Sequence, residues 1–79
     1  MLLSSHDLDK LHTTELGKIR IKKNLSLETD DVIKWCCDCI KNPQAIIERK
    51  GKNIYVYIDD YVLTINAHSL TLITAHIRK

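Results

Sequence analysis

The clearest pattern in the chain is a stripe of apolar residues at helical spacing between residues 28 and 41. Apolar positions there recur at intervals of three and four, which predicts a helix with one buried face. Thr29 or Ser26 can cap its start, and Asn42-Pro43 ends it. The predicted buried face consists of Val32, Ile33, Cys36, Cys37 and Ile40.

Two shorter elements are predicted before this helix. Residues 4–14 form a helix in this prediction, capped by Ser4 or Ser5. Residues 18–22 alternate basic and apolar side chains. At a period of two, this alternation predicts a short strand with one basic face.

In the second half of the chain the apolar period changes to two. Four segments alternate in this way, and they are separated by residues 50–52, Asp59-Asp60 and Ala67-His68. The alternation predicts four strands of an antiparallel sheet. The four segments are residues 45–49, 54–58, 62–66 and 70–75.

The turns set a register for this sheet. A two-residue hairpin at Asp59-Asp60 pairs Val56 with Leu63. A second turn at Ala67-His68 pairs Leu63 with Leu72. In this register the large aliphatic side chains share one face, which packs on the helices, and the other face is open. The open face carries Tyr55, Tyr57, Val62, Thr64, Asn66, Ser69, Thr71 and Ile73.

Together these elements predict an α+β fold. Two helices pack on one face of an antiparallel sheet of four or five strands, and residues 1–79 form a single domain. The net charge of +2 is too small to indicate nucleic acid, but the cations cluster in residues 18–23, whereas the helix at 28–41 is acidic.

The cysteines bear on compartment and metal binding. An odd number of them, three within four positions, is a poor disulfide framework, and no secretion signal or membrane span is evident. Cytoplasmic location with reduced thiols and no cofactor is therefore the expectation. A zinc site built on Cys36 and Cys39 needs two histidines as well, and the same cysteines equally continue the buried stripe.

The histidines are candidates for proton transfer. Cleavage of RNA without a metal needs a base, an acid and cations near the phosphate, and histidine titrates in the right range. His12 precedes the basic segment, and His76 shares a strand face with Thr74. With Arg20, these residues form an adequate catalytic set if the fold brings them together. A given histidine in a small domain is nevertheless usually a surface or packing residue.

Other residues suit RNA binding. Tyr55 and Tyr57 alternate on the open face, where bases can stack, although tyrosine is also common in strands for packing. The basic segment can contact phosphates, or its lysines can protect a sheet edge. The candidate phosphate-binding residues are Lys18, Lys22, Lys23 and Lys52.

Two resemblances accompany these patterns. Residues 11–25 (LHTTELGKIRIKKNL) and 64–76 (TINAHSLTLITAH) resemble a family of small uncharacterised bacterial proteins of unknown function. The order of elements and the final Ile-Thr-Ala-His also resemble the ribonuclease superfamily of barnase, RelE and the colicin D nuclease domain. That resemblance implies metal-independent cleavage of RNA on the open sheet face. It implies that His76 and Thr74 act at the end of the last strand, with His12, Thr14 and Arg20 from the helical half.

Three functions follow as hypotheses. The first is a toxin-like endoribonuclease; the second is a non-catalytic module that binds RNA, a protein or a second copy of the chain; the third is a zinc-dependent adaptor. The first requires the imidazoles of His12 and His76 to share one site, so a separation above about 10 Å argues against that shared site.

Overall fold

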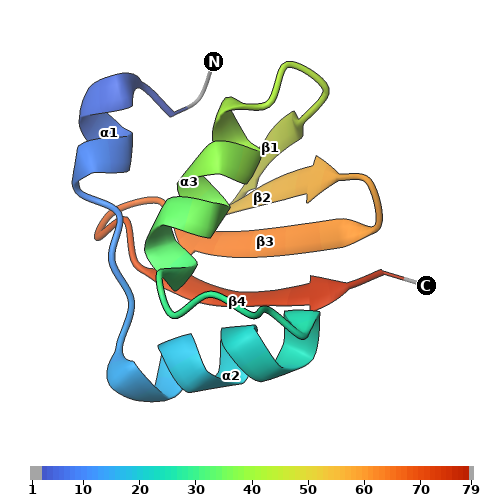
Figure 1. Ribbon diagram of the computed structural model, residues 1–79. Coiled ribbons are helices and arrows are strands. Elements are labelled where there is room, and N and C mark those ends of the chain that lie inside the picture. Colours follow the sequence, from blue (N-terminus) through green and yellow to red (C-terminus); the bar gives the residue numbers. More distant parts are fainter. Residues whose placement is uncertain (1–2, 79) are drawn as a thin grey trace.

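The computed structural model describes residues 3–78 and has an α+β fold (Figure 1). Three helices precede a four-stranded antiparallel sheet whose strands follow one another in chain order. No helix among the described residues is long and apolar enough to cross a membrane. The elements are α1 (Ser5–Asp9), α2 (Glu15–Leu25), α3 (Val32–Lys41), β1 (Ile46–Lys50), β2 (Asn53–Ile58), β3 (Tyr61–Asn66) and β4 (Leu72–Ile77).

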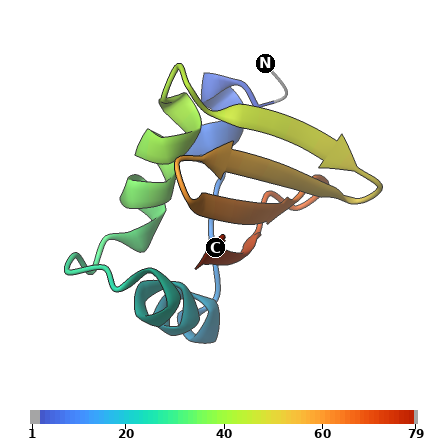
Figure 2. The ribbon, with the colours of Figure 1, turned by 90° about the vertical axis from the view of Figure 1, so that its right-hand side faces the viewer.

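The helices lie on one side of the sheet (Figure 2). Helix α3 crosses one face, and α2 runs beside β4, where the Asn24 amide donates a hydrogen bond to the Ala75 carbonyl oxygen. Between them, Ile21 and Leu25 of α2 and Val32, Cys36 and Ile40 of α3 are buried. The opposite face of the sheet carries no helix among the described residues. The sheet contributes Ile54, Val56, Leu63, Ile65, Leu72 and Ala75 to the core.

Helix α1 confirms the predicted cap but is shorter than predicted. The Ser4 hydroxyl accepts a hydrogen bond from the Asp7 backbone, and the Asp7 carboxylate accepts one from the Ser4 backbone. The helix ends at Asp9, and the chain then runs beside β4, where the backbones of His12 and Leu72 are hydrogen-bonded. These bonds to β4 replace the ones that a longer helix would make.

The predicted strand at residues 18–22 is wrong, because these residues belong to α2. The Thr14 hydroxyl caps this helix by accepting from the Gly17 backbone N–H. Ile21 is buried, whereas Ile19 is 62% exposed, so the two isoleucines do not share a buried strand face. The sheet therefore has four strands and not five.

The predicted helix at 28–41 begins later than expected. Its first residue is Val32, and its cap is Asp31, whose carboxylate accepts from the Lys34 backbone N–H. Thr29 instead supports the loop before the helix by accepting a hydrogen bond from the Asp31 backbone. The predicted stripe is confirmed in part: Val32, Cys36 and Ile40 are buried, and Ile33 and Cys37 are half-buried against the core.

The hairpin of β2 and β3 has the predicted register, with Val56 opposite Leu63. The predicted second turn is wrong, because Leu63 faces Ala75 and not Leu72. The connection is longer than two residues and is organised by Asn66, whose side-chain oxygen accepts from the backbones of His68 and Ser69. The register also shifts between Thr64 and Ile65, where β4 bulges. The predicted open face is therefore wrong in its last strand, because Thr74 and His76 lie beside Thr64 and Val62 where Ile73 was expected to continue that face.

The contribution of this turn to the position of β4 can be tested by mutation. Asn66→Ala removes the acceptor for two backbone N–H groups at an exposed site, so we expect the free energy of unfolding to fall by about 1 kcal/mol. Asn66→Asp keeps the oxygen and is the matched control, with a smaller loss. Urea denaturation followed by circular dichroism measures both, and equal losses in the two variants would contradict the role of the acceptor oxygen.

Candidate functional site

The uncovered face of the sheet brings four of the predicted site residues together. Register places Tyr57 beside Val62 and Val62 beside His76, so these three form one row across the strands. The next row joins Tyr55, Thr64 and Thr74 in the same way. Neighbouring strands lie about 4.8 Å apart, so the backbones of β2 and β4 are separated by roughly 10 Å.

Each tyrosine on this face has a cation near its ring. The Arg78 guanidinium carbon lies 5.3 Å from the Tyr57 ring centroid, and the Lys50 ammonium lies 6.0 Å from the Tyr55 ring centroid. Both rings are half-buried. Lys50 also lies 3.8 Å from the Glu48 carboxylate. We name this surface the tyrosine face: Lys50, Tyr55, Tyr57, Thr74, His76 and Arg78.

Two of these residues, Lys50 and Arg78, are not among the site residues predicted from the sequence. A signal for Arg78 existed, since strand parity places it on the same side as His76. For Lys50 the signal was the pairing of β1 with β2, which sets Lys50 opposite Asn53, one position along the same face from Tyr55. That pairing could not be predicted from the sequence, because apolar and polar side chains alternate only weakly in residues 45–49.

His12 lies at the other end of β4. Its backbone bridges to the start of that strand, opposite Thr71, whereas His76 is five residues further along. At about 3.3 Å per residue the backbones at these two positions are roughly 16 Å apart, so the structure places the two histidines at opposite ends of β4 and not in one site.

The His12 ring takes part in local structure. Nδ1 lies 2.9 Å from the Lys10 carbonyl oxygen and therefore donates a hydrogen bond to it. In the neutral ring, Nε2 is then the acceptor, and it lies 3.1 Å from the Thr71 hydroxyl, which in turn lies 2.7 Å from the Ser69 hydroxyl. This chain of hydrogen bonds ties the loop before α2 to the start of β4.

The basic segment does not form one basic face, because the helix distributes its cations. The Lys22 ammonium donates a hydrogen bond to the Asp30 carboxylate. This hydrogen bond, the positive charge of Lys22 and, to a smaller extent, the charge of Lys18 lower the pKa of Asp30. Arg20 lies one turn before Asn24, on the side of α2 that flanks the edge of β4. Lys23 is exposed to solvent, and Lys52 is exposed in the turn between β1 and β2.

The cysteines are free thiols packed against the core. Burial and the neighbouring thiols raise the pKa of Cys36 to about 12, and burial with the charges of Asp38 and Asp59 raises the pKa of Cys39 to about 11. Within residues 3–78, no group of three or more histidine, cysteine, aspartate or glutamate side chains is placed to hold a metal ion.

These pKa shifts predict how stability depends on pH. The Cys36 thiol keeps its proton in the folded protein to about pH 12, but in the unfolded chain it ionises near about pH 8.5. As pH rises between these values the unfolded state loses protons first, so the free energy of unfolding falls. Cys36→Ala abolishes this titration. We therefore expect the stability advantage of the wild type over Cys36→Ala to shrink between pH 8 and pH 10.5, measured by urea denaturation under reducing conditions. An advantage that stays constant would contradict the buried, protonated thiol.

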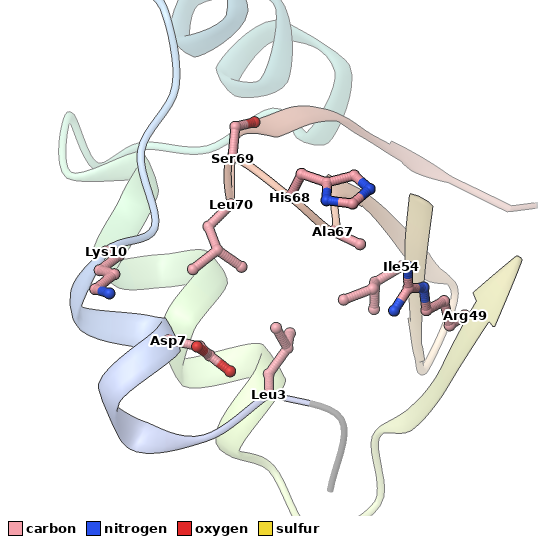
Figure 3. A pocket seen from close by; sticks show the side chains of 9 residues that line it. All are labelled: Leu3, Asp7, Lys10, Arg49, Ile54, Ala67, His68, Ser69 and Leu70. Carbon is pink, nitrogen blue, oxygen red and sulfur yellow. The ribbon is translucent and has the colours of Figure 1, made fainter. Parts of the chain in front are cut away.

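A cavity of about 290 Å³ lies on the helical side of the sheet, between α1 and the turn that precedes β4 (Figure 3). Its floor is apolar and includes Ile54 and Leu70, and its rim is mixed in charge, with Asp7, Lys10, Arg49 and His68. None of the catalytic or RNA-binding residues predicted from the sequence lines it. Asp7 is already engaged in capping α1.

The protein is thus a small α+β protein in which helices cover one face of the sheet and the tyrosine face lies on the other. The chain belongs to the DUF3781 family, a family of proteins of unknown function, whose model matches residues 5–76. Comparison with curated proteins and with solved structures gives no match. The family covers nearly the whole chain and assigns no activity to it.

Proposed function

We propose that this protein binds single-stranded RNA on the tyrosine face. The observation that carries the proposal is the pair of tyrosine rings on β2, each half-buried and each with a cation within about 6 Å. Their positions two residues apart on one strand place the side chains roughly 7 Å from each other. Aromatic rings on an uncovered sheet face are a common platform for stacking unpaired bases.

The charges around the rings support the same ligand. Arg78 and Lys50 can hold phosphates beside a stacked base, and a guanidinium on an aromatic ring can itself stack with a base. His76, exposed on β4, adds a donor to the face, and Lys52 is a further exposed cation in the adjoining turn between β1 and β2. On β1, Ile46 lies opposite Tyr57 and Glu48 opposite Tyr55, which extends the two rows by one residue each. Glu48 is the one carboxylate in these rows, and Lys50 lies beside it, so the surface favours an anion.

RNA cleavage is a second candidate, and His76 is the observation that favours it. His76 is exposed beside Thr74 on the tyrosine face, where it can exchange a proton with a bound ribose 2′-hydroxyl. Arg78, two residues further on, would stabilise the charged phosphorane. Since His12 lies elsewhere, the second proton transfer falls to the Tyr57 hydroxyl or to water. In this proposal the protein is a toxin-like, metal-independent endoribonuclease.

The cytoplasm is the compartment that suits either activity. Three free thiols remain reduced there, and RNA is abundant. A protein partner or a second copy of the chain is the competing occupant of this face, because Ile46, in the Tyr57 row, is 60% exposed.

RNA binding is tested with fluorescently labelled single-stranded oligonucleotides and anisotropy. Tyr57→Leu should weaken binding about tenfold, since one stacked base contributes roughly 1–3 kcal/mol. Arg78→Ala should also weaken binding and reduce its salt dependence. Arg49→Ala is the matched control, because Arg49 lines the cavity on the helical side. Equal affinities for all four proteins, or a dimer in sedimentation that buries this face, would contradict the proposal.

Cleavage is tested separately, by incubating the pure protein with total RNA in EDTA. We expect His76→Ala to abolish cleavage while RNA binding is retained. His12→Ala is the control, because His12 lies at the far end of β4 and its loss removes only the hydrogen bonds to Lys10 and Thr71. Cleavage that survives in His76→Ala would contradict the catalytic role, and binding without any cleavage would leave the non-catalytic RNA-binding module.

A further inference from the structure

A second candidate site lies on the helical side of the sheet, between α3 and the turn that joins β2 to β3. A cavity of about 320 Å³ opens there. It is lined by one aliphatic side chain, Ile58, and by two aromatic and two acidic side chains together with Cys39 and Asn42. Its lining consists of Trp35, Asp38, Cys39, Asn42, Ile58, Asp59 and Tyr61. We name it the acidic aromatic pocket.

Two aromatic rings form adjacent walls of this pocket. The ring centroids of Trp35 and Tyr61 are 5.2 Å apart, and the ring planes are inclined at 88°. In this T-shaped arrangement the edge of one ring packs on a face of the other, so one ring face is occupied by the partner ring and the remaining faces are left for a ligand. Ring faces carry the negative end of the aromatic quadrupole, and tryptophan attracts cations most strongly.

Two carboxylates complete the pocket from different elements. Asp38 projects from α3, and Asp59 occupies the hairpin turn with a φ of 51°. Burial, and after it the charges of Asp38 and Asp59, raise the pKa of the Cys39 thiol, which also lines the pocket. Neither carboxylate forms an ion pair among residues 3–78, although Lys34 and Lys41 lie about one turn from Asp38 on α3.

We propose that the acidic aromatic pocket binds an organic ammonium group. A quaternary ammonium, which carries carbon on all four positions and has no N–H group, is weakly hydrated, so it can leave water for the rings of Trp35 and Tyr61 while Asp38 and Asp59 balance its charge. The primary ammonium of a lysine is more strongly hydrated and is expected to bind less tightly. A bare metal ion fits poorly, since two aromatic walls replace the oxygen ligands that Mg²⁺ and Ca²⁺ need. An anion would meet two like charges, and a neutral apolar ligand would leave the carboxylates unpaired.

The pocket is independent of the tyrosine face. Tyr61 is directed toward α3, where it meets Trp35, whereas Tyr55 and Tyr57 lie on the uncovered side. The two surfaces also have opposite charge. A variant in one should therefore leave the other unaffected, and the two proposals can fail separately.

The protein carries its own reporter for this site, because Trp35 is its single tryptophan. Titration with choline, followed by Trp35 fluorescence, should give a saturable change. The matched ligand is 3,3-dimethylbutan-1-ol, in which a carbon replaces the charged nitrogen; we expect it to bind at least about tenfold more weakly. An Nα-acetyl-lysine amide titration separates the two sources of the ammonium group, a free quaternary amine and a protein lysine. Equal binding of choline and its neutral isostere, or no saturable binding of either ammonium probe, would overturn the proposal.

Matched variants locate the site. Asp59→Asn should weaken choline binding several-fold and reduce its salt dependence, and asparagine tolerates the positive φ at this position, so the fold is expected to persist. Asp60→Asn is the control, because Asp60 occupies the same turn but does not line the pocket. Unchanged affinity in Asp59→Asn and in Asp38→Asn, with folding intact by circular dichroism, would count decisively against an ammonium site here.

Discussion

The register of the hairpin formed by β2 and β3 is the constraint on which the rest of the structure depends. Val56 faces Leu63 and Ile54 faces Ile65, and all four side chains are buried against the helices. Side chains alternate along a strand, so the same register sends Tyr55 and Tyr57 to the other side. A slip of one residue would bury both tyrosines and expose the aliphatics, which is why the core and the tyrosine face are specified together.

The sequence predicts this hairpin well because its information is local. The Asp59-Asp60 turn and the alternating aliphatics determine one register, and the structure has it. The last strand is different, since its register depends on Asn66 binding two backbone N–H groups, on a left-handed Leu70 with φ 57° and on a bulge. These features arise from three-dimensional contacts that an alternating pattern does not encode.

Helix α2 is a second element whose structure the local pattern did not predict. Its alternation of cations and isoleucines suits a strand, and nothing local states that Ile21 and Leu25 will be buried beside β4. Tertiary packing, with the Thr14 cap, decides in favour of the helix. The consequence for function is direct: a strand would have presented the basic residues on one face, whereas the helix separates Arg20 from Lys22, which pairs with Asp30.

The predicted site residues show the same difference between local and long-range information. Strand parity predicts that Thr74 and His76 share a face, and in the structure they do. The predicted register set that face against the helices with Leu72, however, and the bulge between Leu72 and Thr74 is what turns both residues to the uncovered face. The position of His12 depended on how the N-terminal half docks on the sheet. The loop that carries His12 lies beside Thr71, at the start of β4, whereas His76 lies near the end of that strand. The two histidines are therefore far apart.

The arrangement of charge explains why net charge says so little about this protein. Twelve lysines and arginines nearly balance ten aspartates and glutamates, and the sum is +2. In the fold, Lys50 and Arg78 flank half-buried rings on one side of the sheet, whereas Asp38 and Asp59 lie with half-buried rings on the other. A cation beside a tyrosine favours a stacked, anionic ligand, and a carboxylate beside a tryptophan favours a cationic one. The sheet separates these two surfaces, and the side chains that it contributes to the core are apolar. The electrostatic potential is therefore positive on the tyrosine face and negative at the acidic aromatic pocket, and the charges of one surface do not neutralise those of the other.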